Sequence, residues 1–171
     1  MRAFVDPARL PPGEIRRAGV IDHPWVAQLA AEVYRDLGEY GAVMPQWLVQ
    51  PGVVAWVDDA RGERRGFAVL GFYVDHAPRV GVPRTVADLL AIGVMPAYQR
   101  HGLGSRLLTH VIRVCGAVAP AHGIHDLHLT VSHTNVVGQR WYAKSGFRVV
   151  PGDHGTYANG QRAIRMARPL P

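Results

Sequence analysis

The chain is nearly free of cysteine and has no long apolar run. Cys115 is its single cysteine among 171 residues, which excludes an internal disulfide and a cysteine-built metal site. No apolar stretch approaches the length of a membrane-spanning helix, and the first residues lack the apolar core of a signal peptide. We therefore expect a cytoplasmic protein that does not act in a membrane.

Charged residues are also scarce, and the positive ones are scattered. They make up 19% of the chain against 48% for hydrophobic residues, a balance typical of folded globular proteins. The net charge of +6 comes mostly from arginines that stand singly or in pairs. The chain lacks a concentrated basic stripe with aromatic residues between the charges, which disfavours nucleic acid as a partner. A polyanionic small ligand would account for part of the positive charge.

The length suits one domain, built from short strands and helices. Three prolines fall within the first thirteen residues, so we expect an extended arm over residues 1–13 and a single domain over residues 14–171. Strands are predicted at residues 14–18, 53–57, 67–74, 86–94, 127–131, 148–150 and 162–167. A polar loop over residues 58–66 should close a hairpin, and a polar connector should span residues 76–84.

Two helices are predicted in the first third of the chain. One starts at residue 22 or 23, with Pro24 in its first turn, and its apolar spacing extends to Leu37. The other covers residues 44–49, with Pro45 in its first turn. Both would pack an apolar face on the sheet.

One stretch joins a predicted strand to a longer helix through a glycine-bearing basic loop. The apolar run of residues 86–94 stops before Pro96, and the helix should end at Pro120. The apolar positions of this helix recur at three and four residues, at Leu103, Leu107, Leu108, Val111, Ile112, Cys115 and Val118. The first-turn amides of a helix have no intrahelical partners and lie at the positive end of its dipole. The loop therefore predicts a ligand that carries phosphate.

The spacing of the glycines narrows the choice of ligand. A Rossmann turn would need a third glycine where Leu107 stands, and the chain has no Gly-Lys-Ser or Gly-Lys-Thr of a Walker loop. The stretch instead resembles the Gln/Arg-x-x-Gly-x-Gly/Ala signature of the GCN5-related N-acetyltransferases, through Gln99, Gly102 and Gly104. In that family the amides of this loop hold the pyrophosphate of coenzyme A.

A second stretch strengthens the resemblance. Residues 135–147 look like the family's Asn-x-x-Ala-x-x-x-Tyr-x-x-x-Gly-Phe block. They predict a short helix with Asn135 as its N-cap, Lys144 in its last turn and Gly146 in the left-handed position that closes it. Gly138 stands where the family usually has alanine, which costs about 0.5–1 kcal/mol of helix stability. Together the two blocks cover residues 86–147.

The resemblance implies a fold and a coenzyme site. The fold is a mixed α/β (α+β) domain with a largely antiparallel central sheet, splayed between two strands, and with helices on both faces. The strands at residues 86–94 and 127–131 would diverge, and the pantetheine arm of acetyl-CoA would lie between them. The coenzyme-binding residues that it implies are Ile92, Gly93, Val94, Gln99, Arg100, His101, Gly102, Leu103, Gly104, Ser105, Arg106 and Asn135.

The same resemblance implies residues for two proton transfers. Tyr142 matches the family's general acid, which protonates the leaving thiolate, although a helical tyrosine can also be simply packed in the core. Asp88 precedes Val94 by six residues, the offset at which histone-acetylating members carry a glutamate base. Because aspartate is one methylene shorter, it would act through a water; the alternative is a carboxylate that pairs with nearby arginines. Trp141 is expected in the core.

The nine histidines raise the question of a metal site. Four of them surround the strand at residues 127–131, namely His122, His125, His128 and His133. They do not share one face of that strand, and no cysteine or carboxylate completes a ligand set. We expect no metal.

We therefore expect an enzyme, an N-acetyltransferase that moves an acetyl group from acetyl-CoA to a primary amine by direct attack. Two alternatives stay open: a non-catalytic module that binds or senses acyl-CoA, and a transferase that uses a different acyl donor. The acceptor is a small-molecule or peptide amine, and a homodimer, common among relatives, is also left open. Tyr40, Met44 and Trp47 fall in the region that lines the family's acceptor side, although their helical spacing favours core packing.

Overall fold

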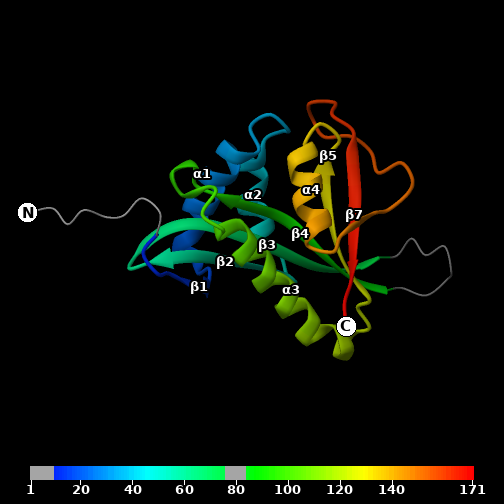
Figure 1. Cartoon of the computed structure of the whole chain (residues 1–171), viewed down its shortest axis with the longest axis horizontal. Coiled ribbons are helices and arrows are strands. Elements are labelled where there is room, and N and C mark those ends of the chain that lie inside the picture. The colour runs from blue at the N-terminus through cyan, green and yellow to red at the C-terminus, as the bar shows by residue number, and fades with distance from the viewer. Residues whose placement is uncertain (1–9, 76–83) are drawn as a thin grey trace, which may run out of the picture.

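A seven-stranded sheet organises the part of the chain that the structure, a computed structural model, describes, residues 10–75 and 84–171 (Figure 1). The strands are β1 (Glu14–Arg17), β2 (Val53–Ala60), β3 (Glu63–Asp75), β4 (Arg84–Val94), β5 (Asp126–Ser132), β6 (Arg148–Val149) and β7 (Ala163–Pro169). Their order is β1-β2-β3-β4-β5-β7-β6, and every neighbouring pair is antiparallel except β4 and β5. The predicted mixed fold is confirmed. Most of the predicted arm and connector, residues 1–9 and 76–83, lies outside the described residues.

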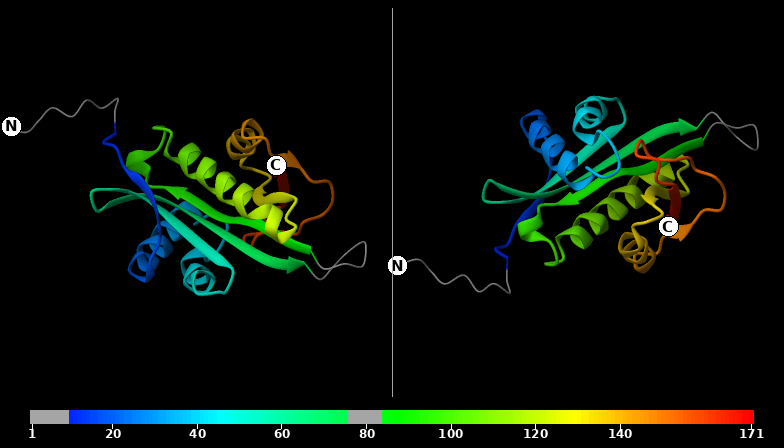
Figure 2. Two further views of the ribbon diagram at one scale, coloured as in Figure 1. Left: turned by 90° about the horizontal axis from the view of Figure 1, so that it is seen from below. Right: turned by 90° about the horizontal axis from the view of Figure 1, so that it is seen from above.

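Helices cover both faces of this sheet (Figure 2). On one face lie α1 (His23–Val33) and α2 (Tyr40–Leu48), and on the other lie α3 (Leu103–His122) and α4 (Val136–Lys144). Successive side chains of β3 alternate between the two cores, as the pleat requires. Phe67 and Val69 pack in the core under α1 and α2, whereas Ala68 and Leu70 pack in the core under α3.

The sheet splays between β4 and β5. These strands pair only from Ala87 to Leu89 on β4, and beyond that point the two strands diverge. The divergence begins at a bulge, because the register with β3 steps from Leu89 to Ala91 and leaves Leu90 unpaired. Such a bulge bends a strand and changes its twist locally. The predicted splay is therefore present, and the carboxyl-terminal half of β4 does not pair with β5.

Two prolines lie inside helices that they were expected to start or to end. α3 continues past Pro120 to His122 and closes at Gly123, whose φ of 63° is left-handed. In this last turn the proline removes only one helical hydrogen bond. α2 starts at Tyr40, four residues before the predicted start, so Pro45 lies in its interior. α1 is shorter than its apolar spacing suggests and ends at Val33.

The loop predicted over residues 58–66 is mostly strand. β2 runs to Ala60 and β3 begins at Glu63, so that only Arg61 and Gly62 turn the chain, both with positive φ. The prediction was wrong because the charges of this stretch pair with one another across the sheet and with β1. Hydrophobic periodicity does not reveal such pairing.

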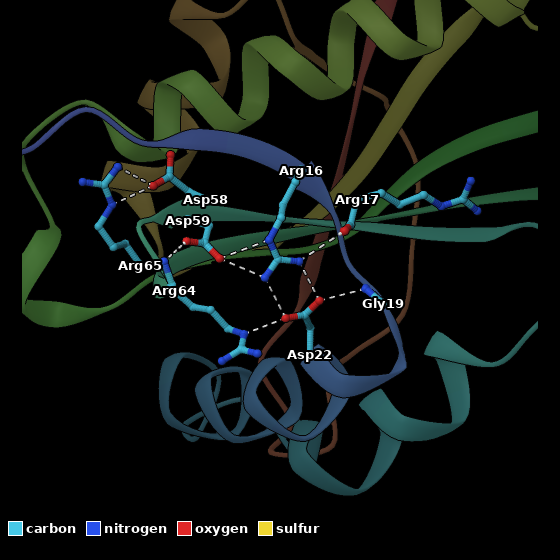
Figure 3. Close-up of polar contacts among 9 residues, drawn as sticks. Arg16, Arg17, Gly19, Asp22, Asp58, Asp59, Arg64 and Arg65 are labelled. Carbon is cyan, nitrogen blue, oxygen red and sulfur yellow. Dashed lines mark hydrogen bonds and ion pairs between the residues drawn. The ribbon is translucent and has the colours of Figure 1, made fainter.

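An ion-pair cluster joins β1, the segment before α1 and the hairpin (Figure 3). Arg16 donates to the buried Asp22 through both Nη atoms, at 2.8 and 3.0 Å, and to Asp59 through Nη2 at 2.9 Å. Arg64 donates from Nε to Asp22 at 2.6 Å, and the amide of Gly19 donates to the same carboxylate at 2.8 Å. These charge-assisted bonds tie the entry of α1 to the edge of the sheet.

We expect the free energy of unfolding to fall as the pH drops below about 4. The bonds from Arg16, and then those from Arg64 and Gly19, hold the pKa of Asp22 well below its usual range. A carboxyl whose folded pKa lies below its unfolded value, near 3.9, stabilises the fold above that value and loses the contribution as the pH falls. Urea unfolding at pH 7, 5 and 3 measures the effect. Asp22→Asn should show a shallower pH dependence; an equal slope would contradict this role.

α3 presents a continuous apolar stripe to the sheet. Leu107, Val111 and Cys115 are fully buried on it, as their spacing predicts. Burial raises the pKa of the Cys115 thiol to about 12, so this cysteine is an inert part of the core. Among the described residues, no helix is both long and apolar enough to cross a membrane.

Candidate active site

A cleft of about 580 Å³ lies where the end of β4, the loop after it and the starts of α3 and α4 meet. Most of the predicted coenzyme-binding residues line it: Ile92, Gly93, Val94, Gln99, Arg100, Gly102, Gly104, Ser105 and Asn135. The other three, His101, Leu103 and Arg106, line a second cavity of about 330 Å³ behind the loop, which also takes in Arg100 and Gly102. The structure therefore brings both sequence blocks to one place.

The loop before α3 has the geometry of an anion site. Arg100 and Gly102 have positive φ, 64° and 81°, and Gly102 immediately precedes the helix. No side chain among the described residues caps this helix end, so its first amides stay available at the positive end of the dipole. A Cβ at Gly104 would lie 3.5 Å from the indole ring of Trp141, which is an ordinary contact distance. A loop of this geometry before a helix is suited to bind a phosphate group.

A buried ion pair anchors the loop from behind. Asp58 on β2 has no exposed surface, and Arg65 on β3 is 1% exposed. Arg65 donates to Oδ1 of Asp58 from Nε at 2.7 Å, with Nη2 at 2.6 Å, and from Nη1 to the Pro11 carbonyl at 2.7 Å. Arg106, in the first turn of α3, places its Nη2 3.2 Å from the other carboxylate oxygen. One buried carboxylate thus joins the hairpin to the start of α3.

α4 forms the opposite wall of the cleft. Asn135 caps it as predicted, with its Oδ1 accepting from the amide of Gly138 at 2.8 Å. The capping side chain lies against Gly138, where an added Cβ would come within 2.5 Å of it, which explains glycine at that position. Trp141 is not a plain core residue. Its ring lines the cleft, and its Nε1 donates to Ser105 on α3 at 3.0 Å.

Tyr142 lies on the buried face of α4. It is 9% exposed, and its ring packs against Phe147 with ring centres 5.9 Å apart. Burial raises the pKa of Tyr142 well above its usual value, and the nearby phenols of Tyr34 and Tyr157 raise it further. The hydroxyl therefore keeps its proton at neutral pH, which a proton donor requires.

Asp88 lies on β4 just before the bulge and is 8% exposed. Its Oδ2 accepts from Tyr73 at 3.0 Å and pairs with Arg165 of β7 at 3.1 Å. Arg165 also donates to His128 at 3.3 Å; burial, and then the charge of Arg165, lower the pKa of that histidine. The arginine pairing that was the structural alternative for Asp88 is present, and a role as base stays a prediction.

A cluster of tyrosines lies between α1 and β4. Tyr34, just after α1, stacks on Tyr40 with ring centres 4.4 Å apart, and Tyr40 meets Trp47 edge to face. Met44 is fully buried beneath them. The sequence pointed to Tyr40, Met44 and Trp47 here, and the structure packs all three on the core under α1 and α2.

Sequence patterns gave no functional reason to select Tyr34 or Tyr157. Burial, and then the charges of Tyr40 and Tyr34, raise the pKa of Tyr157. The segment between β6 and β7 that carries Tyr157 also contacts the chain after α1, because the amide of Asn159 donates to the Leu37 carbonyl at 3.3 Å. These contacts join positions more than 100 residues apart, beyond the reach of any local pattern.

The metal question can be answered for the described residues only. Within residues 10–75 and 84–171, no group of three or more histidine, cysteine or acidic side chains is arranged to hold a metal ion. His101, in the loop, bonds through Nδ1 to the Gln99 carbonyl at 2.7 Å and is otherwise exposed.

Known structures resemble this chain over most of its length. An Ard1 from Thermoplasma volcanium has a TM-score of 0.71 and 21% identity, covering 93% of this chain and 98% of its own. The ribosomal-protein-S18-alanine N-acetyltransferase from Escherichia coli has a TM-score of 0.68 and 22% identity, covering 93% and 94%. NAA60 from Arabidopsis thaliana, solved with acetyl-CoA, has a TM-score of 0.69 and 14% identity, covering 93% and 99%. A search of curated protein sequences gave no match.

The family assignment rests on the sequence match. A model of the acetyltransferase (GNAT) family matches residues 22–147, which include the loop, the cleft and α4. Acetyltransferases of this family use acetyl-CoA as their co-substrate. The chain therefore belongs to the acetyltransferase (GNAT) family.

Proposed function

We propose that this protein transfers the acetyl group of acetyl-CoA to a primary amine by direct attack. The observation that carries the proposal is the cleft itself. It joins a helix N-terminus with free amides to the part of β4 that does not pair with β5, and Tyr142 lies on the α4 that forms its wall. A phosphate-bearing ligand at the loop could therefore extend an arm along β4.

The residues of the cleft divide between binding and chemistry. The loop from Arg100 to Arg106 would hold the pyrophosphate through backbone amides. Gly93 and Val94 line the part of the cleft along which the pantetheine arm would run. Bound acetyl-CoA supplies an activated thioester carbonyl, and a backbone N–H of β4 would stabilise the oxyanion formed when the amine attacks.

Two side chains would move protons. Tyr142 would give its proton to the leaving thiolate, a role for which its raised pKa keeps it protonated. Asp88 would accept the proton of the amine through a water. Because Tyr73 and Arg165 both contact Oδ2, its Oδ1 is the oxygen we assign to this step.

Binding of acetyl-CoA to the purified protein tests the coenzyme half of this proposal. A ligand at about 100 times its Kd stabilises the folded state by about 2.7 kcal/mol. For a chain of this size that raises the midpoint of thermal unfolding by about 5–10 °C. Duplex DNA should leave the midpoint unchanged. A larger rise with a longer acyl-CoA would indicate another donor, and no rise with saturating acetyl-CoA would contradict the proposal.

A further inference from the structure

The hydroxyl of Tyr34 holds both polar backbone groups of Ile92. It accepts from the Ile92 amide at 2.9 Å and donates to the Ile92 carbonyl at 2.8 Å. These contacts join positions 58 residues apart, one at the end of α1 and the other on β4. Burial of the phenol raises the pKa of Tyr34, so the hydroxyl keeps its proton and can donate and accept at the same time.

The register of β4 shows which side of the strand these groups face. The amide of Met95 donates to the Arg65 carbonyl of β3 at 2.9 Å. Backbone groups alternate sides along a strand, so those of Gly93 also face β3, whereas those of Ile92 and Val94 face the opposite edge. That edge is where β4 and β5 have diverged, and Ile92 and Val94 line the cleft.

The backbone groups on the cleft edge of β4 therefore have side-chain partners. The hydroxyl of Tyr34 accepts from the Ile92 amide, and Gln99 donates from Nε2 to the Val94 carbonyl at 3.0 Å. Unpaired polar groups at a strand edge need such partners, because leaving them without any is costly. The same groups are the ones that a pantetheine arm and a thioester carbonyl would use. One amide cannot serve Tyr34 and a thioester oxygen with full strength at once.

We propose that Tyr34 is a gate at Ile92, where the thioester of acetyl-CoA would bind. The hydroxyl of Tyr34 must leave Ile92 before the acetyl carbonyl of acetyl-CoA can bind there. This proposal rests on the proposed acetyl transfer. It makes Tyr34 a positioning residue that competes with the coenzyme, not one that holds it. Because the phenol oxygen is fixed in the plane of its ring, it can leave Ile92 only if the Tyr34 side chain moves, which also changes its stacking on Tyr40.

The competition predicts tighter coenzyme binding when the hydroxyl is removed. Tyr34→Phe keeps the ring and its stacking but removes both bonds to Ile92. Acetyl-CoA should then bind about tenfold more tightly, since the wild-type protein must give up one or two net hydrogen bonds on binding. Isothermal titration measures the Kd. Adenosine 3′,5′-bisphosphate, which is too short to reach Ile92 from the phosphate loop, should bind both proteins equally.

Unfolding measurements separate a gate from a merely structural tyrosine. Without ligand, Tyr34→Phe should be less stable than the wild type, whereas in saturating acetyl-CoA the two proteins should have equal stability. A structural role would leave the same deficit under both conditions. Should the variant fail to fold alone, the gate predicts that acetyl-CoA restores folding, and failure in its presence would overturn the proposal.

The matched control is Tyr40→Phe, which removes a hydroxyl from the ring stacked on Tyr34 but no bond to β4. Its Kd for acetyl-CoA should equal that of the wild type. Unchanged or weaker binding of acetyl-CoA by Tyr34→Phe would overturn the gate. A wild-type protein that does not bind acetyl-CoA would instead refute the proposed function on which the gate rests.

Discussion

Replacing Tyr142 with phenylalanine is expected to lower kcat by about 100- to 1,000-fold while changing the Kd for acetyl-CoA by less than about twofold. A positioned general acid contributes on the order of 10²–10⁴ to a rate. The hydroxyl is the only group that the substitution removes, and the ring should keep its packing against Phe147. The steady-state rate of thiol release, measured with a chromogenic disulfide, gives kcat for any accepted amine. Cys115 is buried and should contribute little background.

Comparing the change in kcat with the change in the Kd for acetyl-CoA distinguishes a proton donor from a tyrosine that only packs. A tyrosine that acts only by packing would lower the unfolding midpoint and would weaken acetyl-CoA binding along with the rate. A proton donor lowers the rate alone. If Tyr142→Phe keeps most of its kcat, the thiolate is protonated by another group or by water, and the assignment from the second sequence block is wrong.

The second large effect is expected at the buried Asp58. Asp58→Ala should lower the free energy of unfolding by about 3–5 kcal/mol, because it leaves the charge of Arg65, only 1% exposed, without its carboxylate. Urea unfolding at neutral pH measures the loss. Asp36→Ala, at an exposed aspartate, is the matched control and should change stability by no more than about 0.5 kcal/mol.

A double variant identifies the cause of that loss. When both partners of a buried pair are replaced by apolar residues of similar size, the uncompensated charge disappears. Asp58→Leu combined with Arg65→Met should therefore recover at least half of the stability that Asp58→Ala loses. A loss below about 1 kcal/mol in Asp58→Ala, or no recovery in the double variant, would contradict the role of this ion pair as an anchor.

Much of the site could be predicted because its parts are local in sequence. The strand, the glycine loop and α3 follow one another within about 40 residues, and the cap of α4 by Asn135 depends on neighbours three residues away. Glycine spacing and helix-cap chemistry report such geometry directly. The residues of the two sequence blocks therefore line one cleft, as their order in the chain predicts.

The features that the sequence did not predict depend on contacts between distant positions. The bond from Tyr34 to Ile92 spans 58 residues, and the pairing of Asp88 with Arg165 spans 77. The charges of residues 58–66 looked like a loop because Asp58 pairs with Arg65 on the neighbouring strand of the hairpin and Asp59 pairs with Arg16 on β1. Trp141 was assigned to the core because periodicity cannot tell an apolar wall of a cleft from an apolar core.

Transfer of a labelled acetyl group tests the central claim most directly. The protein would be mixed with acetyl-CoA carrying a ¹³C-labelled acetyl group and with three acceptors: a peptide with a free α-amine, a lysine peptide with a blocked N-terminus, and a polyamine. Mass spectrometry of the acceptors would follow the label. We predict a labelled amide on at least one acceptor, formed far more slowly by Tyr142→Phe. Tight binding of acetyl-CoA with no label on any acceptor would contradict catalysis and favour a module that only binds or senses acyl-CoA.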